Sequence, residues 1–309
     1  MTSDGEWSAT RGWVDGRLGG GERVMAAERL RGGWTSQMRL LRTTAERHLV
    51  LRSFVTPFYR RHAEGLLNRE AAVLTLLAGE EGVPAARLVA VDATARHCDD
   101  PSLLMTRLPG TVRLDERGAA RRADLLARQL AAVHAVRPPE PGRPRPYQAW
   151  TSPERVRVPE GTRAPWVWDR AVEVIRGEPP SYEGCFLHRD FHPGNVLFAD
   201  GAVSGVVDWV ETSWGPADLD VAHCATALAL LHGPREGMAF ADRYAAAGGR
   251  PLADGPAHLY WRLLDALAFA PDAEKVAVPW RELGRTDLTP GLLARRLEAY
   301  VEAVLERYA

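Results

Sequence analysis

The segment between residues 186 and 208 limits most strongly what this chain can fold into. It runs from the apolar pair Phe186-Leu187 through a polar string, 188–195, and a second apolar stretch to Val206-Val207-Asp208. Apolar runs on both sides of a short polar loop predict a buried hairpin. The pattern therefore places Asp190 near the start of the loop, Asn195 further along it, and Asp208 at the end of a strand.

These three side chains have the chemistry of a phosphate-transfer site. Asp190 can orient an attacking hydroxyl or accept its proton. Asn195 offers an uncharged oxygen and Asp208 an anionic one, and Mg²⁺ takes oxygen ligands together with phosphate oxygens and water. We therefore expect Asp190 as catalytic base, with Asn195 and Asp208 as magnesium ligands beside a nucleotide. A loop that only happens to contain polar residues is the competing interpretation, and the joint occurrence of all three argues against it.

Two histidines of the same string, His188 and His192, form an H-x-x-x-H pair. Zinc sites with this spacing place both rings on one face of a helix, whereas this pair lies on a predicted loop beside Pro193. We therefore expect no zinc here. His188 is predicted to brace the loop through hydrogen bonds, and His192 is predicted either to brace the loop or to contact substrate.

The composition excludes several classes of partner. Lys+Arg 39 against Asp+Glu 40 give a formal charge of -1, so no global field attracts nucleic acid or an anionic membrane. No stretch approaches the roughly 18 apolar residues of a membrane span, and the N-terminus has no apolar leader. Cys98, Cys185 and Cys224 are widely spaced and are predicted to be free core thiols. We expect a cytoplasmic protein, monomeric or homodimeric, that binds neither nucleic acid nor membrane.

The hydrophobic pattern divides the chain into a strand-rich first third and a helical remainder. Strands are expected over 23–30, 37–42, 48–52, 87–91 and 102–105, with one helix over 64–77. Further helices are expected over 121–136, 222–231, 256–269 and 291–308. The glycines from Gly16 to Gly21 predict a flexible N-terminal turn. The Pro-rich segment 137–165 is expected to be either a disordered linker or a loop that shapes a binding site.

His188-Arg189-Asp190 with Asn195 resembles the catalytic loop of protein kinases. The fuller string through His192-Pro193-Gly194-Asn195 is more similar to the aminoglycoside phosphotransferase and choline kinase group. The resemblance extends over most of the chain. It covers the nucleotide-covering turn at 32–36, the third strand at 49–52, the first helix at 69–70, the strand into the adenine hinge at 103–105, and the segment closing the magnesium motif at 215–222.

This resemblance implies an α+β, protein-kinase-like fold of two lobes. An N-terminal antiparallel β-sheet lobe with one main helix spans 1–107, and a larger, mainly helical lobe for catalysis and acceptor binding spans 108–309. The nucleotide is then expected to be held by Thr35, Ser36, Arg52, Glu70, Met105 and Arg107. Asp220 is expected to support the catalytic loop together with His188 and His192.

The sequence departs from the related families at two positions. The third strand often carries a lysine that pairs with the helix acid and holds phosphates, and Arg52 stands in its place. A guanidinium can still contact phosphate and Glu70, although its reach and geometry differ. Asp208 is followed by Trp209-Val210 where protein kinases carry Phe-Gly, so we expect no activation-loop switch and disfavour a protein kinase.

The resemblance implies an ATP-dependent (or GTP-dependent) phosphotransferase that uses Mg²⁺ and acts on a hydroxyl of a small molecule. An antibiotic is the favoured acceptor, of the aminoglycoside, macrolide or peptide type. Choline, homoserine, a sugar or a thiosugar remains an alternative, as does a nucleotide-binding pseudokinase scaffold. A cationic acceptor requires carboxylates in the helical lobe, and four are available: Glu211, Asp265, Asp272 and Glu274. The competing interpretation is that each of them is a solvated surface charge.

Overall fold

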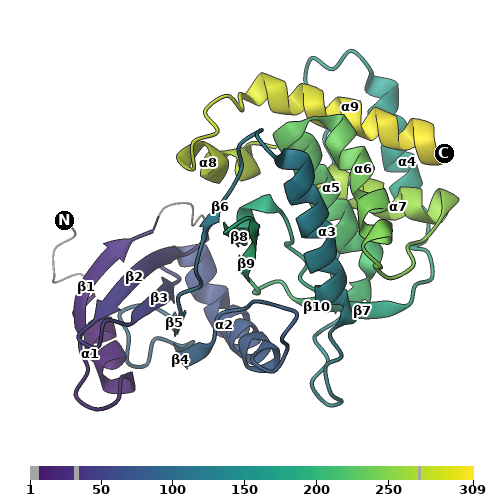
Figure 1. Ribbon diagram of the computed structural model, residues 1–309. Helices are drawn as coiled ribbons and strands as arrows, with labels where there is room; N and C mark the ends of the chain where they lie inside the picture. Colours follow the sequence, from purple (N-terminus) through teal and green to yellow (C-terminus); the bar gives the residue numbers. More distant parts are fainter. Residues whose placement is uncertain (1–6, 31–34, 271–272) are drawn as a thin grey trace. The chain divides into compact units, whose positions relative to one another are not determined.

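The computed structural model describes residues 7–30, 35–270 and 273–309, which form two compact units (Figure 1). Unit 1 comprises Met1–Gly110 and Ser204–Glu211, and unit 2 comprises Thr111–Val203 and Thr212–Ala309. A unit built on an antiparallel sheet and a mainly helical unit confirm the predicted α+β fold class. The lobe boundary after residue 107 stays a prediction, and the sequence pattern does not anticipate that 204–211 joins unit 1.

Unit 1 is built on a five-stranded antiparallel sheet with the strand order β1-β2-β3-β5-β4. The strands are β1 (Val24–Arg29), β2 (Gln37–Thr43), β3 (His48–Ser53), β4 (Leu88–Asp92) and β5 (Ser102–Thr106). Side chains alternate between the two faces of a strand, so Arg52 points away from the face that holds Leu49 and Leu51. Helix α2 (Pro57–Leu77) supplies Glu70 to the face of Arg52, where the two form an ion pair.

Helix α1 (Ser8–Arg17) was not expected from the sequence. Its Trp13 and Val14 are buried in one apolar cluster with Leu49 and Leu51 of the sheet. The prediction of a flexible turn that begins at Gly16 is wrong, because the helix continues to Arg17. Glycine is a poor helix former, and the burial of the tryptophan and its neighbours outweighs that local cost.

Unit 2 is organised around helix α5 (Ala217–His232), in which every residue from Ala217 to Leu231 is buried. A mainly apolar helix without a solvent-facing polar side belongs in a core. It packs against four of the other helices, α3, α6, α7 and α9 (Figure 1). The remaining helices are α3 (Ala119–Ala135), α4 (Pro165–Arg176), α6 (Pro234–Ala246), α7 (Gly255–Ala266), α8 (Glu274–Glu282) and α9 (Pro290–Tyr308). Within the described residues, we find no helix with the length and apolarity needed to cross a bilayer.

The strands around the central motif do not pair as expected. They are β6 (Thr111–Val112), β7 (Gly184–Leu187), β8 (Val196–Ala199), β9 (Ala202–Val206) and β10 (Ser213–Pro216). β7 pairs antiparallel with β10, which places Phe186 opposite Trp214, and β6 pairs with β8. The predicted hairpin between Phe186-Leu187 and Val206-Val207 is therefore wrong. Short apolar runs show that a strand is buried but do not specify its partner.

The Pro-rich segment is attached to unit 2 by backbone hydrogen bonds. The N–H of Tyr147 donates to the carbonyl of Trp214 at 2.9 Å, and the N–H of Trp214 donates to the carbonyl of Arg145 at 2.8 Å. Trp150 then lies edge-on to His223, with ring centroids 5.0 Å apart. Of the two alternatives, the loop that shapes a site fits these contacts, and the disordered linker does not.

Candidate functional site

In unit 1 the predicted nucleotide-side residues Arg52, Glu70 and Asp208 form one cluster. Nη1 of Arg52 lies 3.3 Å from Oε2 of Glu70 and 2.9 Å from Oδ1 of Asp208. Arg52 and Glu70 are 3% and 1% exposed, whereas a quarter of the Asp208 side chain is exposed. A buried carboxylate is costly unless it is paired, so Arg52 is required to keep Glu70 in this position. Of the two acids in the cluster, Asp208 is the one whose carboxylate is exposed to solvent.

The backbone around Asp208 is held in a conformation that few residues adopt. Its φ of 66° lies in the left-handed region, which aspartate tolerates better than most residues. The next residue fixes the turn, because the Trp209 indole donates to the carbonyl of Val206 at 3.0 Å and its backbone N–H donates to Glu70. Arg69 of α2 also donates to the carbonyl of Val210. These bonds anchor the Asp208 turn to α2.

The pKa of Glu70 is raised to about 7, because burial disfavours the charged carboxylate. The neighbouring Arg52 acts in the opposite direction, and the charge of Asp208 adds to the rise. Whatever stabilises the anion of Glu70 must therefore come from Arg52 and from the Trp209 N–H.

The other residues expected to hold nucleotide lie on or beside the same sheet. Met105 is buried in β5 opposite Val50, and the N–H of the exposed Arg107 donates to the carbonyl of His48. Ser36 is buried immediately before β2, with Thr35 half-buried beside it. Three residues of the expected nucleotide-covering turn, 32–34, lie outside the described residues.

In unit 2, Asp220 of α5 supports the loop that follows β7 through hydrogen bonds to the loop backbone. The backbone N–H groups of His188 and Arg189 each donate to the Asp220 carboxylate at 2.8 Å. The His134 ring lies 3.2 Å from the same carboxylate. Although burial by itself raises the pKa of Asp220, the hydrogen bond from His134 helps to hold it below the usual range. Arg189 adopts a φ of 75°, and its guanidinium stacks over Trp150 at 4.1 Å.

Both oxygens of Asp190 have a donor within unit 2. Nδ2 of Asn195 donates to Oδ2 at 3.0 Å, and Nε2 of His223 lies 3.1 Å from Oδ1. Burial by itself raises the pKa of Asp190, but the hydrogen bond from His223 and the charge of His192 bring that pKa below its usual range. Asp190 is therefore a carboxylate at neutral pH, and its side chain is 30% exposed.

Sequence reasoning missed His223, and it considered Asp265 of α7 only as a ligand for a cationic acceptor and not as the partner of His223. Nδ1 of His223 lies 3.0 Å from Oδ1 of Asp265, and both residues are buried. A signal was present, because His223 is one of few polar residues in a mainly apolar helix and lies one turn after Asp220.

The two histidines of the string have different partners. Nδ1 of His188 accepts from the N–H of Asp190 at 3.2 Å, so this buried ring is bonded to the backbone of the loop. Nδ1 of His192 accepts from the N–H of Gly194 at 3.0 Å, and its Nε2 lies 3.9 Å from Asp190. Asp190, His192 and His223 are close enough to share a metal ion. Because both ring nitrogens of His223 face carboxylates, that ring is not available as a metal ligand.

The four carboxylates considered for a cationic acceptor do not form a cluster in unit 2. Asp265 is buried against His223, and Glu274 forms a two-pronged pair with Arg281, with contacts of 2.7 and 2.5 Å. Glu211 belongs to unit 1, and Asp272 lies outside the described residues. The expectation that these acids are available to a cation is wrong for Asp265 and Glu274, because each already neutralises a side chain of the protein.

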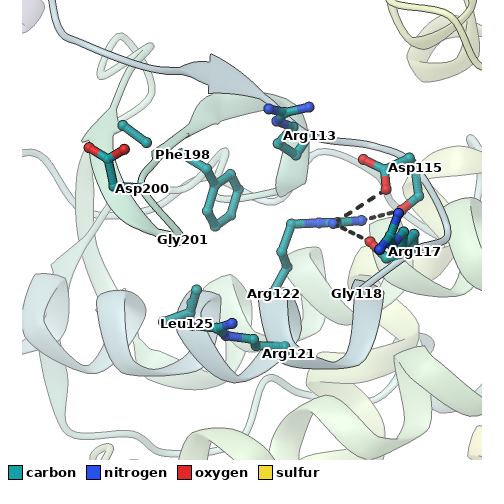
Figure 2. A pocket seen from close by; sticks show the side chains of 11 residues that line it. Arg113, Asp115, Arg117, Gly118, Arg121, Arg122, Leu125, Phe198, Asp200 and Gly201 are labelled. Atoms are coloured by element: carbon teal, nitrogen blue, oxygen red, sulfur yellow. Dashed lines mark hydrogen bonds and ion pairs between the residues drawn. The ribbon is translucent and has the colours of Figure 1, made fainter.

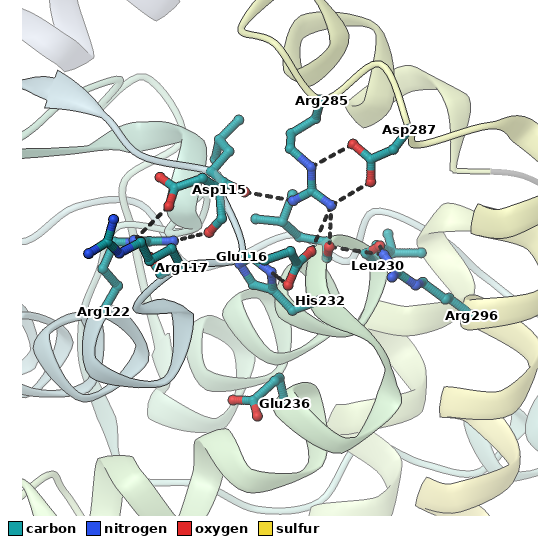
Figure 3. Close-up of polar contacts among 12 residues, drawn as sticks. Asp115, Glu116, Arg117, Arg122, Leu230, His232, Glu236, Arg285, Asp287 and Arg296 are labelled. Carbon is teal, nitrogen blue, oxygen red and sulfur yellow. Dashed lines mark hydrogen bonds and ion pairs between the residues drawn. The ribbon is translucent and has the colours of Figure 1, made fainter.

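The ends of α5 are fixed by charges that complement the helix dipole. Asp218 and Asp220 lie in its first turn. At its other end, Arg285 and Arg296 donate to the carbonyl of Leu231 at 3.1 and 2.9 Å, and Arg285 also pairs with Glu116 (Figure 3). This anchoring fixes the helix that carries both Asp220 and His223.

A cavity of about 400 Å³ in unit 2 opens between β8, the turn at Asp200-Gly201 and the start of α3 (Figure 2). Arg122 lies at its wall and pairs with Asp115 at 3.6 Å. The floor includes Phe198 and Leu125. None of the predicted site residues lines this cavity, so it is not the place where their chemistry occurs.

The chain is similar to known proteins in sequence and in fold. A family model described as the phosphotransferase enzyme family matches residues 26–264, more than three quarters of the chain. An aminoglycoside 3'-phosphotransferase of Streptomyces fradiae is 26% identical over 201 residues, which cover 60% of this chain and 73% of that protein.

Solved structures share the fold. One is a candidate aminoglycoside phosphotransferase of Ralstonia eutropha JMP134, with a TM-score of 0.64, 19% identity and coverage of 97% of this chain and 98% of that chain. Another is a thermostable variant of aminoglycoside phosphotransferase APH(4)-Ia in ternary complex with AMP-PNP and hygromycin B. It has a TM-score of 0.63 and 15% identity, with coverage of 96% of this chain and 98% of that chain.

Proposed function

Because this chain belongs to the phosphotransferase enzyme family, we propose that it transfers the γ-phosphoryl group of ATP to a hydroxyl group of a small molecule. The observation that carries the proposal is the Asp190 carboxylate. It is held ionised by His223 and Asn195 on a loop whose backbone is bonded to Asp220. GTP is the alternative phosphate donor.

Asp190 acts on the acceptor hydroxyl. Its lowered pKa makes it a weak base, so its first role is to orient the hydroxyl toward the γ-phosphorus. In the reaction the bond between the acceptor oxygen and phosphorus forms while the bond from phosphorus to the departing ADP oxygen breaks. The hydroxyl proton passes to Asp190 and then to solvent.

Arg52, Glu70 and Asp208 act on the nucleotide. Arg52 supplies the positive charge for the phosphates, and Glu70 holds the guanidinium in place through the 3.3 Å pair. Met105 and Arg107 are proposed to lie beside the base, and Thr35 and Ser36 beside the phosphates.

Asn195 and Asp208 fit the requirements of magnesium ligands. Because Nδ2 of Asn195 donates to Asp190, its amide oxygen points away from that carboxylate and can bind a cation. Asp208 contributes an anionic, partly exposed oxygen. Both are the hard oxygen donors that Mg²⁺ prefers. When bound, the ion would neutralise charge on the nucleotide phosphates.

For the acceptor we propose a hydroxylated antibiotic, of the aminoglycoside, macrolide or peptide type. The support is the similarity to the Streptomyces fradiae aminoglycoside 3'-phosphotransferase. Metabolites such as choline, homoserine, a sugar or a thiosugar are the second candidate class, because Asp265 and Glu274 are already paired with protein cations. The use of ATP favours a cytoplasmic location, and the choice between monomer and homodimer stays a prediction.

The test is a panel of hydroxylated compounds from both classes, incubated with the protein, ATP and Mg²⁺ and examined by mass spectrometry. We expect one compound class to gain the mass of one phosphate as ADP forms in equal amount. A reaction without Mg²⁺ is the control. If the protein binds ATP but neither ADP nor a phosphorylated product forms with any compound, a pseudokinase scaffold replaces this proposal.

A further inference from the structure

Asp220 and His223 lie on the same face of α5, because residues three positions apart are neighbours on a helix surface. Asp220 accepts the backbone N–H groups of the catalytic loop, and His223 reaches the side chain of Asp190 in the same loop at 3.1 Å. One helix, buried from Ala217 to Leu231, therefore contacts both the backbone of the loop and the side chain of its acid.

Contacts with several neighbouring residues hold the ring of His223 in place. Asp265 of α7 lies 3.0 Å from Nδ1. The ring stacks on Phe269 with centroids 5.7 Å apart, and it lies edge-on to Trp150 with centroids 5.0 Å apart. Among the described residues, Asp190, His192 and Asp265 are the titratable groups in contact with the ring.

Two carboxylate partners require two donors on one ring, which only the imidazolium form provides. Burial by itself lowers the pKa of His223, but the negative charges of Asp265 and Asp190 outweigh it and raise the pKa to about 9. His223 therefore brings a positive charge to Asp190. A neutral His223 with Nδ1–H bonded to Asp265 would have no proton on Nε2 and could not donate to Asp190.

We propose that His223, held by Asp265, is a positioning residue for Asp190 in phosphoryl transfer. With His223 on Oδ1 and Asn195 on Oδ2, the plane of the carboxylate is fixed and its remaining lone pairs are presented to the acceptor hydroxyl. Asp265 acts through His223 by keeping the ring charged and correctly turned. This inference rests on the function proposed above.

The first test compares His223→Gln with His232→Gln. Both histidines belong to α5 and both bond a carboxylate, but His232 pairs with Glu116 at the far end of the helix. We expect His223→Gln to lower kcat about 100-fold while KM for ATP stays unchanged, because only the acceptor hydroxyl is misplaced. His232→Gln should keep wild-type kcat. Equal kcat for the two variants would overturn the proposal.

The second test uses Asp265→Asn and remains informative if His223→Gln fails to fold. Without the charge of Asp265 the pKa of His223 falls, so Nε2 loses its proton as pH rises. The kcat of Asp265→Asn should therefore decline between about pH 6 and pH 8, a range in which wild type stays constant. A constant ratio of variant to wild-type kcat over that range would overturn the role of Asp265.

A third measurement separates this inference from the proposed function. The titration of the His223 imidazole, followed by NMR in wild type and Asp265→Asn, does not require turnover. A wild-type ring that titrates near pH 6.5 would contradict the charged pair even if the enzyme is active. The protein could instead phosphorylate no acceptor although the ring stays charged to about pH 9. That result would leave the charged pair in place and would overturn both the proposed function and the role of the pair in transfer.

Discussion

Nη1 of Arg52 donates to Oδ1 of Asp208 at 2.9 Å, and the same nitrogen lies 3.3 Å from Glu70. One guanidinium nitrogen thus makes both contacts, although an arginine can bind in a two-pronged manner. A single point charge at this position would satisfy the same two acids. Both contacts of Arg52 with these acids therefore pass through one nitrogen, which is a contact that a lysine ammonium could also make.

This relationship predicts different outcomes for two substitutions of Arg52. Arg52→Lys should fold and keep most activity, with KM for ATP raised only about threefold, since a lysine also provides a point charge. Arg52→Ala leaves the buried Glu70 without its positive partner, with the Trp209 N–H still bonded to it, and should lower the free energy of unfolding by about 3 kcal/mol. ATP kinetics and chemical denaturation of both variants check this. An Arg52→Ala enzyme with wild-type stability and KM would show that another residue holds Glu70 and the phosphates.

Asp208→Ala should abolish most Mg²⁺-dependent activity, because water cannot replace a charged ligand. We expect kcat to fall about 100-fold or more, with a higher concentration of Mg²⁺ needed for the remaining rate. The measurement is kcat as a function of Mg²⁺ at saturating ATP. Full activity with an unchanged Mg²⁺ dependence would remove Asp208 from the metal site.

Asp220→Asn tests how the catalytic loop is supported. One acceptor oxygen and the negative charge are lost, although the His188 and Arg189 N–H groups and His134 remain, so the free energy of unfolding should fall by about 3 kcal/mol at pH 7. The folded-state pKa of Asp220 is lowered. Its stabilising effect is therefore present above about pH 4 and disappears as pH falls below that value. Denaturation of both proteins at pH 7 and pH 3 should show a difference at pH 7 that shrinks in acid.

Arg285→Ala and Arg281→Ala form a matched pair that tests the anchoring of α5. Arg285 is buried and donates to the carbonyls of Leu114 and Leu231, whereas its acidic partners Glu116 and Asp287 are exposed. Its loss should cost about 2 kcal/mol, mainly through the buried hydrogen bonds that are lost. Arg281 is more exposed and pairs with Glu274, so its loss should cost less than about 1 kcal/mol. Thermal unfolding distinguishes them. If the two variants lost the same amount of unfolding free energy, burial of the arginine would not determine how much it stabilises the protein.

Much of the fold was predictable because long apolar patterns dominate it. The strands of unit 1 and helices α3, α5, α7 and α9 appear near their expected positions. Helices α4, α6 and α8 were not predicted. Helices α4 and α6 each begin with a proline, which resembles a break in the sequence although proline is well accepted at the first helical position. Helix α1 was missed because its stability comes from packing against the sheet.

The candidate site was predictable where spacing along the chain determines it. Asp190 and Asn195 are five residues apart and meet through a local hydrogen bond, and Arg52 meets Glu70 as expected. Asp265 is 42 positions from His223 and 75 positions from Asp190, and no local pattern reports contacts of that range. The strand pairing of β7 with β10 was missed for the same reason.

The most direct test of the central claim is the rate of phosphate transfer from ATP to the best acceptor, measured for wild type and Asp190→Asn under single-turnover conditions. Asparagine preserves the size of the side chain but cannot accept the hydroxyl proton. We predict a rate lowered by about 100-fold to 10,000-fold with ATP binding intact. Transfer at the wild-type rate by Asp190→Asn would contradict the account.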